Sequence, residues 1–566
     1  MKEAFYLRNR TAVINFTSAY YQNAEELLSS EGFSLFLKRL LTQLAVDDIE
    51  MFEWIVRKEP LETFIPKLVL LLKLLMVMDV EDIHEPTLQT MSSIRLLSLV
   101  EKGYDYWRKL ERFTTVTTTS SNSLQFASFL EADQKFNALV LSIYRTLEEK
   151  LQGTKNRVYR QMSAGSNGSL VLKSYRWNIP NEYRTLKSVP FIHTVMMRTP
   201  LLLYPRSNKR VGSFTEIDYN PMSKLRMNKQ YWMCFPAKVG NLLIYIYFHQ
   251  DFISGAVSLA NLFELATEEE CKNRKPDAIV LFGNEDEKDE TTFYHDTEND
   301  IWVGSVSYSE RIEYFGYLKK MSLTLHNLAK MNKGWLPIHG AMVNVYLRNG
   351  NRKNIVLIGD SGAGKSETIE ALRGLGNKDI VKVDVVFDDM GSFHIENDQV
   401  YAQGTEIGAF VRLDDLDKGT AYRDMERSIF MNPESSNARV ILPSSPYDLI
   451  VHDQPIDMVL YANNYEDKRG MHRFESVLEA KSVFIEGKRM ALGTTQEKGI
   501  STTYFANPFG PMQQQEICGR IFEDVFDQLY KNKVYVGEIY TCLGVAEHKD
   551  GLQDAAAQLL EYIKNH

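Results

Sequence analysis

The stretch Asn354-Ile-Val-Leu-Ile-Gly359-Asp-Ser-Gly-Ala-Gly364-Lys365-Ser366-Glu-Thr368 decides the organisation of this 566-residue chain. Its apolar run predicts a strand, its glycines predict a turn, and the residues that follow favour a helix from about Lys365 to Leu375. The stretch matches the pattern G-x-x-x-x-G-K-[ST] without a mismatch. Glycines allow several backbone N–H groups to point at one anion. The stretch therefore predicts a phosphate-binding loop.

Two side chains of this loop complete the predicted phosphate site. Lys365 would place a positive charge on the β- and γ-phosphates, and the Ser366 hydroxyl would bind Mg²⁺. We expect a nucleotide such as ATP, with GTP or pyrophosphate as alternative phosphoryl donors. The residues expected to contact it are Gly359, Ser361, Gly362, Ala363, Gly364, Lys365 and Ser366.

The composition is that of an ordinary globular protein, with 44% hydrophobic and 25% charged residues. A chain of this length has room for two to four domains. The net charge of -9 argues against a dedicated nucleic-acid surface. The four cysteines lie far apart without a C-x-x-C pair, which predicts neither a zinc site nor a disulfide framework. A reducing cytoplasm is the expected compartment.

No segment of the sequence predicts a membrane anchor or a signal peptide. The longest apolar run, Leu68 to Val80, is short and is interrupted by Lys73 and Asp79. We interpret it as a buried helix.

The hydrophobic pattern divides the chain into three predicted domains. Residues 1–155 show helical spacing, for example at Phe33, Phe36, Leu37, Leu40, Leu41 and Leu44. We expect an all-helical domain there, which serves as a scaffold or acts in regulation or homo-oligomer formation. Residues 156–334 predict a mixed α/β lobe, with strands such as Phe191 to Met197 and Leu242 to Phe248. Residues 335–566 predict a lobe that binds nucleotide and metal.

A pair of carboxylates follows the phosphate-binding loop in the sequence. Asp388 and Asp389 come at the end of a predicted strand from Ile380 to Phe387. Carboxylates on a fixed backbone are the oxygen ligands that divalent ions need beside a triphosphate, although such a pair is elsewhere usually a solvated turn. Arginines at 412, 427 and 439 could reach the transferring phosphoryl group, and the residues alone do not say which one does.

From Ser309 to the C-terminus the chain resembles phosphoenolpyruvate carboxykinase. The segment Tyr314-Phe-Gly316-Tyr-Leu-Lys319-Lys320 is similar to that family's Tyr-Gly-Gly-Glu-Met-Lys-Lys, and Lys320 stands nineteen residues before His339, as the family's metal-binding lysine and histidine do. The resemblance implies that Lys320, His339 and Asp389 bind Mn²⁺ and that Asp388 serves Mg²⁺. A lysine that binds a metal must be neutral, so Lys320 would need burial and a nearby cation to lower its pKa.

Two later segments extend the resemblance. Asn437-Ala-Arg439-Val resembles the family's Asn-Thr-Arg, whose arginine bridges the phosphoryl group, so the resemblance selects Arg439. Gly493-Thr-Thr and Gly499-Ile-Ser501 are similar to segments that line the nucleotide base, which implies base contacts for Gly493 and Ser501.

Other segments depart from that family. Its Thr-Gly-Arg-Ser-Pro segment, which binds the substrate carboxylate, has only a faint echo at Arg206-Ser207. His339-Gly-Ala-Met-Val replaces the family's His-x-Ser-Ala-Asn, and the phosphate loop looks more like that of HPr kinase/phosphorylase. The identity of the phosphoryl acceptor therefore stays open.

Together these patterns predict an α/β protein with mixed sheets, a two-lobed carboxykinase-like core and an all-helical N-terminal domain. The first expected function is conversion of oxaloacetate and ATP to phosphoenolpyruvate, ADP and carbon dioxide, with Mn²⁺ and Mg²⁺. The alternatives are a kinase of a small-molecule or protein hydroxyl, and a nucleotide-binding regulator with little turnover. The expected catalytic residues are Lys320, His339, Lys365, Asp388, Asp389 and Arg439.

Overall fold

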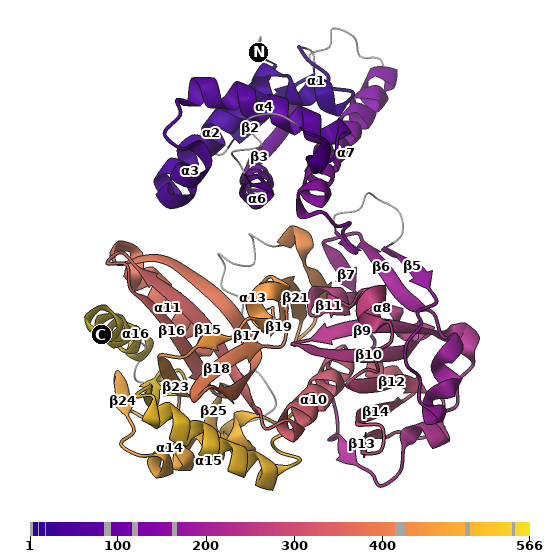
Figure 1. The fold of residues 1–566 in the computed structure, drawn as a ribbon, viewed down its shortest axis with the longest axis vertical. Coiled ribbons are helices and arrows are strands. Elements are labelled where there is room, and N and C mark those ends of the chain that lie inside the picture. Colours follow the sequence, from indigo (N-terminus) through magenta and orange to yellow (C-terminus); the bar gives the residue numbers. More distant parts are fainter. Residues whose placement is uncertain are drawn as a thin grey trace. The chain divides into compact units, whose positions relative to one another are not determined.

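The computed structural model describes residues 4–8, 11–16, 18–83, 92–115, 123–160, 167–413, 425–492, 498–545 and 550–566. Contacts divide the chain into two compact units, Met1–Asn156 and Arg157–His566 (Figure 1). The first break lies one residue from the boundary expected at residue 155. The residues expected to form two further lobes, 156–334 and 335–566, belong to one unit by their contacts.

The first unit is mainly helical but contains a small sheet. Its helices are α1 (Ala24–Leu28), α2 (Glu31–Asp47), α3 (Ile49–Val56), α4 (Leu61–Val77), α6 (Ser93–Lys109) and α7 (Ser123–Gln152). Its strands are β1 (Phe5–Arg8), β2 (Thr11–Asn15) and β3 (Glu111–Thr115), in the order β1-β2-β3. The expectation of an all-helical domain is therefore wrong, because strands this short leave little trace among long helical patterns.

The helices of the first unit pack through leucine-rich faces. Ser30 is the N-cap residue of α2, and its hydroxyl accepts a hydrogen bond from the N–H of Phe33 at 3.0 Å. The buried stripe continues with Leu37, Leu40, Leu41 and Leu44, as the helical spacing predicts. A cavity of about 130 Å³ remains between α2, α4, α6 and α7, and its lining is almost entirely apolar.

The second unit contains a ten-stranded and an eight-stranded sheet. The strands of the first are β4 (Val158–Tyr159), β5 (Gly168–Lys173), β6 (Phe191–Met197), β8 (Thr215–Glu216), β9 (Trp232–Val239), β10 (Leu242–His249), β11 (Glu264–Leu265), β12 (Ala278–Asn284), β13 (Thr291–Asp296) and β14 (Ile301–Ser307). Its main path is β4-β6-β9-β10-β12-β14-β13-β8. The strands of the second are β15 (Leu336–Leu347), β16 (Arg352–Ile358), β17 (Ile380–Glu396), β18 (Gln399–Gly404), β22 (Gln454–Pro455), β23 (Met458–Asn463), β24 (Met471–Arg473) and β27 (Tyr535–Tyr540). Their order is β22-β18-β17-β15-β16-β23-β27-β24.

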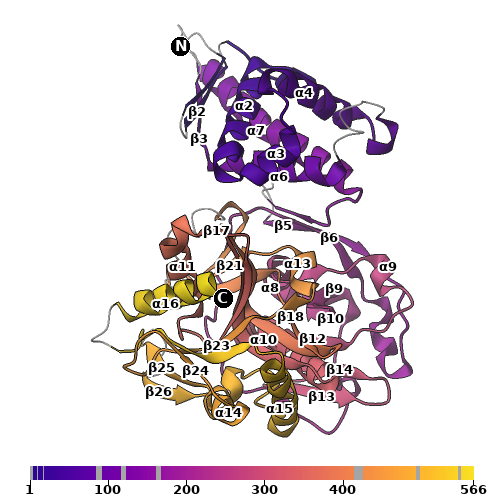
Figure 2. The ribbon, with the colours of Figure 1, turned by 60° about the vertical axis from the view of Figure 1, so that its left-hand side comes forward.

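Helices cover both faces of the eight-stranded sheet. The helices of the second unit are α8 (Ile253–Ser258), α9 (Glu268–Cys271), α10 (Gly316–Asn332), α11 (Lys365–Leu375), α13 (Tyr447–Val451), α14 (Val477–Glu486), α15 (Gln515–Lys531) and α16 (Gly551–Asn565). In Figure 2, α11 and α16 lie on one face of this sheet and α14 and α15 lie on the other. Alternating residues of β15 serve the two faces, with Ala341 and Val343 toward α11 and α16, and Ile338 and Met342 toward the main core.

The helix α10 lies between the two large sheets and contacts β12, β14 and β15. Leu318, Met321, Leu325 and Leu328 recur at helical spacing on one side of α10. The helix is nevertheless buried on nearly every side, including the polar residues Ser322, Thr324, His326 and Asn327. A helix in this position has no side for solvent, so its polar residues must find partners inside the core.

Two small sheets complete the second unit. The four-stranded sheet has the strands β7 (Leu201–Leu203), β19 (Gly408–Arg412), β20 (Ile429–Met431) and β21 (Arg439–Pro443), in the order β19-β21-β20-β7. The hairpin of β25 (Lys488–Leu492) and β26 (Lys498–Thr502) forms the other. The protein is thus mixed α/β with several sheets, as the sequence predicts.

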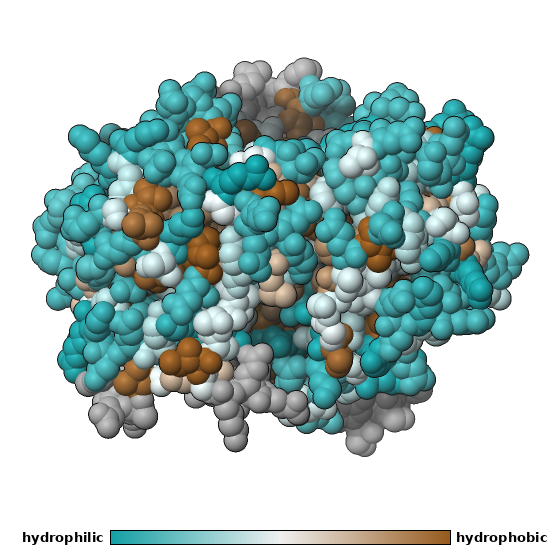
Figure 3. Space-filling model, turned by 90° about the horizontal axis from the view of Figure 1, so that it is seen from below, coloured by the Kyte–Doolittle hydropathy of each residue, from teal (hydrophilic) through white to brown (hydrophobic). Residues whose placement is uncertain are grey.

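Hydrophobic side chains are scattered on the surface face that Figure 3 shows. They occur singly or in small groups among hydrophilic ones. Within the described residues, no helix has the length and hydropathy needed to cross a bilayer.

Candidate functional site

The predicted phosphate loop connects β16 to α11, which begins at Lys365 and ends at Leu375 as expected. Gly364 has φ +101°, a conformation that favours glycine, and precedes the helix. The Lys365 ammonium donates to the carbonyl oxygens of Gly359 at 2.8 Å and Asp360 at 3.1 Å. The lysine and the N-terminal end of α11 therefore point into the same loop, which is the arrangement that binds phosphate.

The strand register brings the predicted metal ligands to the base of this loop. Gly340 of β15 pairs with Ile358 of β16 on one side and with Asp389 of β17 on the other. The N–H of Gly359 donates to the carbonyl of His339 at 3.1 Å. A Cβ atom on Gly340 would lie 2.5 Å from the Leu357 carbonyl oxygen, so only glycine fits this row. This explains the glycine that follows His339.

Asp388 lies beside the loop serine. Its Oδ1 accepts a hydrogen bond from the Ser366 hydroxyl at 2.9 Å. Burial raises the pKa of Asp388 to about 6, although Ser366 and Lys365 act in the opposite direction. The expectation that the strand ends before Asp388 is wrong, because β17 continues to Glu396 with a register shift near Val386. The pairing with β15 continues past Asp389 through Gly391 and Ser392 to Phe393.

Asp389 is held by two nitrogen groups. Its Oδ1 lies 3.1 Å from His339 Nε2, and its Oδ2 accepts from the Lys319 ammonium at 2.5 Å. Burial alone would raise the pKa of Asp389, but the positive charges of Lys319 and His339 hold that pKa well below its usual range. His339 Nδ1 is 2.8 Å from the carbonyl oxygen of Ala506, which fixes the ring.

The lysine on Asp389 is Lys319, not the expected Lys320. Lys319 is almost fully buried and also lies 3.0 Å from Glu406. Burial lowers the pKa of Lys319, but the charges of Asp389 and Glu406 outweigh it and raise that pKa above the ordinary value. Burial raises the pKa of Glu406 to about 7, because Lys319 only partly offsets the lost solvation. Glu406 lies in no recognisable motif, so no sequence pattern pointed to it.

Lys320 lies next to this cluster in a different environment. Its ammonium is 5.2 Å from the ring centre of Phe509, and among the described residues it makes no hydrogen bond or ion pair. Burial lowers the pKa of Lys320 to about 8, and the charges of Arg210, Lys319 and Arg439 add to the effect. The low pKa that the resemblance requires of Lys320 is thus present, while direct contact with His339 or Asp389 is not.

Arg439 and Arg210 both act on Lys320 by their charge, and both lie in or beside the four-stranded sheet. Arg439 begins β21, and Arg210 follows β7, which pairs with β20 in the same sheet. The Asn208 side chain donates to the Ser436 carbonyl at 2.9 Å, which ties the two segments together. The Arg439 guanidinium lies 5.4 Å from the Phe410 ring centre, and its buried Nε has no hydrogen-bond partner among the described residues. A half-buried arginine in this state suits an anionic ligand.

The other arginines considered from the sequence lie elsewhere or have partners. Arg206 forms exposed ion pairs with Glu310 and Glu313. Arg412 stands directly opposite Arg439 in the β19–β21 pair and is buried. Arg427 precedes β20 in a short 3₁₀ turn.

The predicted base-binding segment forms the hairpin β25–β26. Ser501 is paired with Arg489, whose guanidinium donates to Asp360 Oδ2 at 2.9 Å and to the Ser361 carbonyl at 2.9 Å. The Ser501 hydroxyl is buried, and no described residue forms a hydrogen bond with it. The hairpin is therefore fastened to the phosphate loop through Arg489, a residue that no motif indicated. Gly493 lies outside the described residues.

Comparison with protein-family models and with curated proteins finds no match to this chain. The site must therefore be judged by its own donor groups. Ser366 and Asp388 offer a hydroxyl and a carboxylate oxygen 2.9 Å apart, which suits Mg²⁺ beside a phosphate. His339 Nε2 and Asp389 Oδ1 offer a nitrogen and an oxygen 3.1 Å apart, a mixed set that suits a transition metal such as Mn²⁺.

Proposed function

We propose that the chain is a nucleotide-dependent phosphoryl-transfer enzyme of the phosphoenolpyruvate carboxykinase type. It would convert oxaloacetate and ATP to phosphoenolpyruvate, ADP and carbon dioxide. The observation that supports this most is the pair His339 and Asp389 on the strand row that also begins the phosphate loop, with Lys319 reaching Asp389 from α10. A simple phosphate-binding loop has no need for a second, nitrogen-containing donor set at its base.

The chain's own groups divide the work of the proposed reaction. The loop N–H groups and Lys365 bind the phosphates, and Ser366 with Asp388 would hold Mg²⁺. His339 and Asp389 would hold Mn²⁺, which supplies a positive charge for the developing enolate oxygen. Among the described residues, Arg439 and Lys320 have no carboxylate in an ion pair with them, so they would orient the substrate's carboxylate and phosphoryl groups.

Nucleotide binding is tested with the loop lysine. In Lys365→Ala, the rise in melting temperature caused by ATP with Mg²⁺ should disappear, because the charge on the β- and γ-phosphates is lost. Lys378→Ala, at an exposed position beyond the end of α11, is the matched control and should keep the rise. An equal rise in both variants would place the nucleotide elsewhere.

The reaction itself is tested by product formation. Purified protein with Mn²⁺ should form phosphoenolpyruvate from oxaloacetate with ATP, GTP or pyrophosphate as donor. Arg439→Ala should lower kcat and kcat/KM together, with little change in nucleotide Kd, because the arginine would act on the group in transfer. Arg206→Ala removes an exposed, ion-paired arginine and should leave the rate unchanged. No product with any of the three donors would contradict the proposal.

A hydroxyl kinase is the second candidate, and Lys319 favours it. Lys319 is charged and paired with Asp389, so this carboxylate already has a counter-ion without any metal. In that case an aspartate of the 388/389 pair would accept the proton of the hydroxyl. Phosphate transfer from ATP to a hydroxyl acceptor, without phosphoenolpyruvate formation, would support this candidate. Nucleotide binding with neither reaction would support a regulator.

A further inference from the structure

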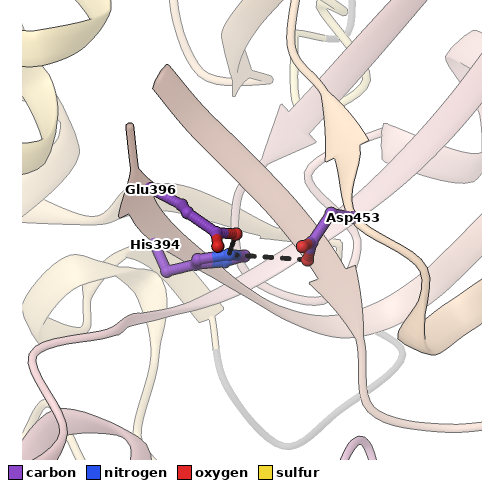
Figure 4. Close-up of side chains that lie close together, drawn as sticks. All are labelled: His394, Glu396 and Asp453. Atoms are coloured by element: carbon purple, nitrogen blue, oxygen red, sulfur yellow. Dashed lines mark ion pairs between the residues drawn. The ribbon is translucent and has the colours of Figure 1, made fainter. Parts of the chain in front are cut away.

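A second group of possible metal ligands lies at the far end of β17. His394 and Glu396 are two residues apart on this strand, so their side chains leave the same face of the sheet. Asp453 precedes β22, which pairs with β18 beside β17. Figure 4 shows that the three side chains converge from these two segments. Asp389 is five residues before His394, about 17 Å along the strand, so this group is separate from the site at the phosphate loop.

The His394 ring lies within ion-pair distance of both carboxylates. His394 Nε2 lies 3.4 Å from Asp453 Oδ1 and 3.9 Å from Glu396 Oε2. One ligand atom from each residue can be chosen so that all three lie within 4.8 Å of one another. Ligands bound to one tetrahedral ion at about 2.0–2.2 Å are separated by roughly 3.3–3.6 Å. The group is thus close to the size that one ion requires.

The His394 ring is buried but makes no hydrogen bond. Its exposed fraction is 7%, its Nδ1 has no partner, and among the described residues neither nitrogen is hydrogen-bonded. The nitrogen without a partner is Nδ1. Nε2, on the other side of the ring, is the atom that faces the carboxylates of Asp453 and Glu396.

Neighbouring residues hold the ligands in place. The Trp335 ring stacks on His394 with centres 3.9 Å apart and an angle of 15° between the planes. The Gln403 amide donates to Asp453 Oδ1 at 2.6 Å. In metal sites, packing and hydrogen bonds of this kind orient the residues that bind the metal directly. Glu396 is largely exposed, so an ion could enter from solvent.

The local charges also permit a cation. A buried lysine, Lys330, lies over the Trp335 ring. Burial and the charge of Lys333 lower the pKa of Lys330 to about 6, so Lys330 is mostly neutral at pH 7 and does not repel an ion. The two negative charges of the Glu396 and Asp453 carboxylates would balance the two positive charges of a divalent ion.

We propose that His394, Glu396 and Asp453 bind one divalent transition-metal ion, which clips the end of β17 to the segment before β22. The nitrogen and two carboxylate oxygens suit zinc or a neighbouring metal of the first row, and leave a position open for water. This proposal does not depend on the proposed function.

The test uses Zn²⁺ as the probe and the full-length, chelator-treated chain. A His339→Ala background removes a ligand of the other site, so that zinc at that site does not obscure the result. In this background we expect one tight equivalent of zinc. Adding Glu396→Gln, at an exposed position that the fold does not need, should weaken zinc affinity at least tenfold. Adding His394→Ala should abolish the tight equivalent.

His472→Ala is the matched control, because His472 is an exposed histidine 3.2 Å from a single carboxylate, that of Glu479. It should leave zinc binding unchanged. Co²⁺ in place of zinc should give the intense visible absorption of a tetrahedral ion in the background chain, and Glu396→Gln should reduce that absorption. Unchanged zinc affinity and cobalt absorption in both Glu396→Gln and His394→Ala would overturn the proposal.

Discussion

Two adjacent lysines of α10 show how strongly burial and neighbours decide the state of a side chain. Lys319 faces two carboxylates and keeps its proton, whereas Lys320 faces three positive groups and has its pKa lowered to about 8. The first provides a fixed charge for Asp389. Lys320 gains or loses its proton about one pH unit above neutrality. A bound ligand can therefore change the protonation of Lys320 more easily than that of Lys319.

His326 of α10 allows a prediction about pH. The ring is fully buried beside Asn327, and burial, with the charge of Lys330, lowers the pKa of His326 to about 3. In the unfolded chain this histidine takes up a proton below about pH 6.5, but in the folded chain it does not. His326 should therefore cost up to about 1.4 kcal/mol of stability for each pH unit below that value, until the pH approaches the folded pKa.

The measurement is the free energy of unfolding of wild type and His326→Leu between pH 7 and pH 4.5. The variant should lose less stability on acidification, even if it is less stable at pH 7, because leucine takes up no proton. Identical pH slopes for the two proteins would contradict the assigned pKa.

At the residue scale, the sequence predicted the parts of the site that lie in short motifs. The loop from Gly359 to Ser366, the Asp388/Asp389 pair and His339 come together as expected. The lysine assignment differed, since spacing along the chain cannot tell which of two adjacent helix residues faces a strand seventy residues away. Glu406, Arg489 and Arg210 join the site only through tertiary contacts, which leave no local pattern.

At the scale of the elements, strands and helices with strong patterns were predicted closely. β6 and α11 have the expected bounds, because each is a continuous apolar or amphipathic run with clear turn residues at its ends. β17 extends nine residues beyond its expected end at Phe387. The prediction ended the strand too early because the two charged residues Asp388 and Asp389 in its middle resemble a turn. β1, β2 and β3 were missed beside much longer helices.

Two glycines within elements should respond in opposite ways to alanine. A Cβ on Gly103 of α6 would lie 3.4 Å from the nearest atom, Leu40 Cδ2, whereas a Cβ on Gly304 of β14 would lie 2.6 Å from Met321 Sδ. Gly103→Ala should stabilise its unit by about 0.5–1 kcal/mol, since alanine is the better helix former. Gly304→Ala should destabilise its unit by about 1–3 kcal/mol through overpacking.

Denaturant unfolding of the two alanine variants, followed by circular dichroism, measures both changes. Each variant serves as the control for the other, because both introduce one methyl group at a glycine. Stabilisation by Gly304→Ala would show that α10 can move away from β14 at little cost, which its complete burial argues against.

At the scale of the whole molecule, the division at residue 156 predicts two unfolding events. Each unit has its own hydrophobic core, one centred on α2 and α4 and the other on α10 and its sheets. Scanning calorimetry should show two transitions, and ATP with Mg²⁺ should raise only the one that belongs to residues 157–566. A single transition that shifts as a whole would mean that the units unfold together.

The pairing of β7 with β20 has a consequence for how the chain is made. Leu201 pairs with Ile429, and Asn208 donates a hydrogen bond to Ser436. Ser436 is synthesised 228 residues after Asn208. At a synthesis rate of about 5–20 residues per second, the ribosome needs roughly 10 to 50 s to add that partner. During this time the edge of β7, and with it the segment that carries Arg210, has no strand beside it, so a nascent chain should need protection from aggregation at this point.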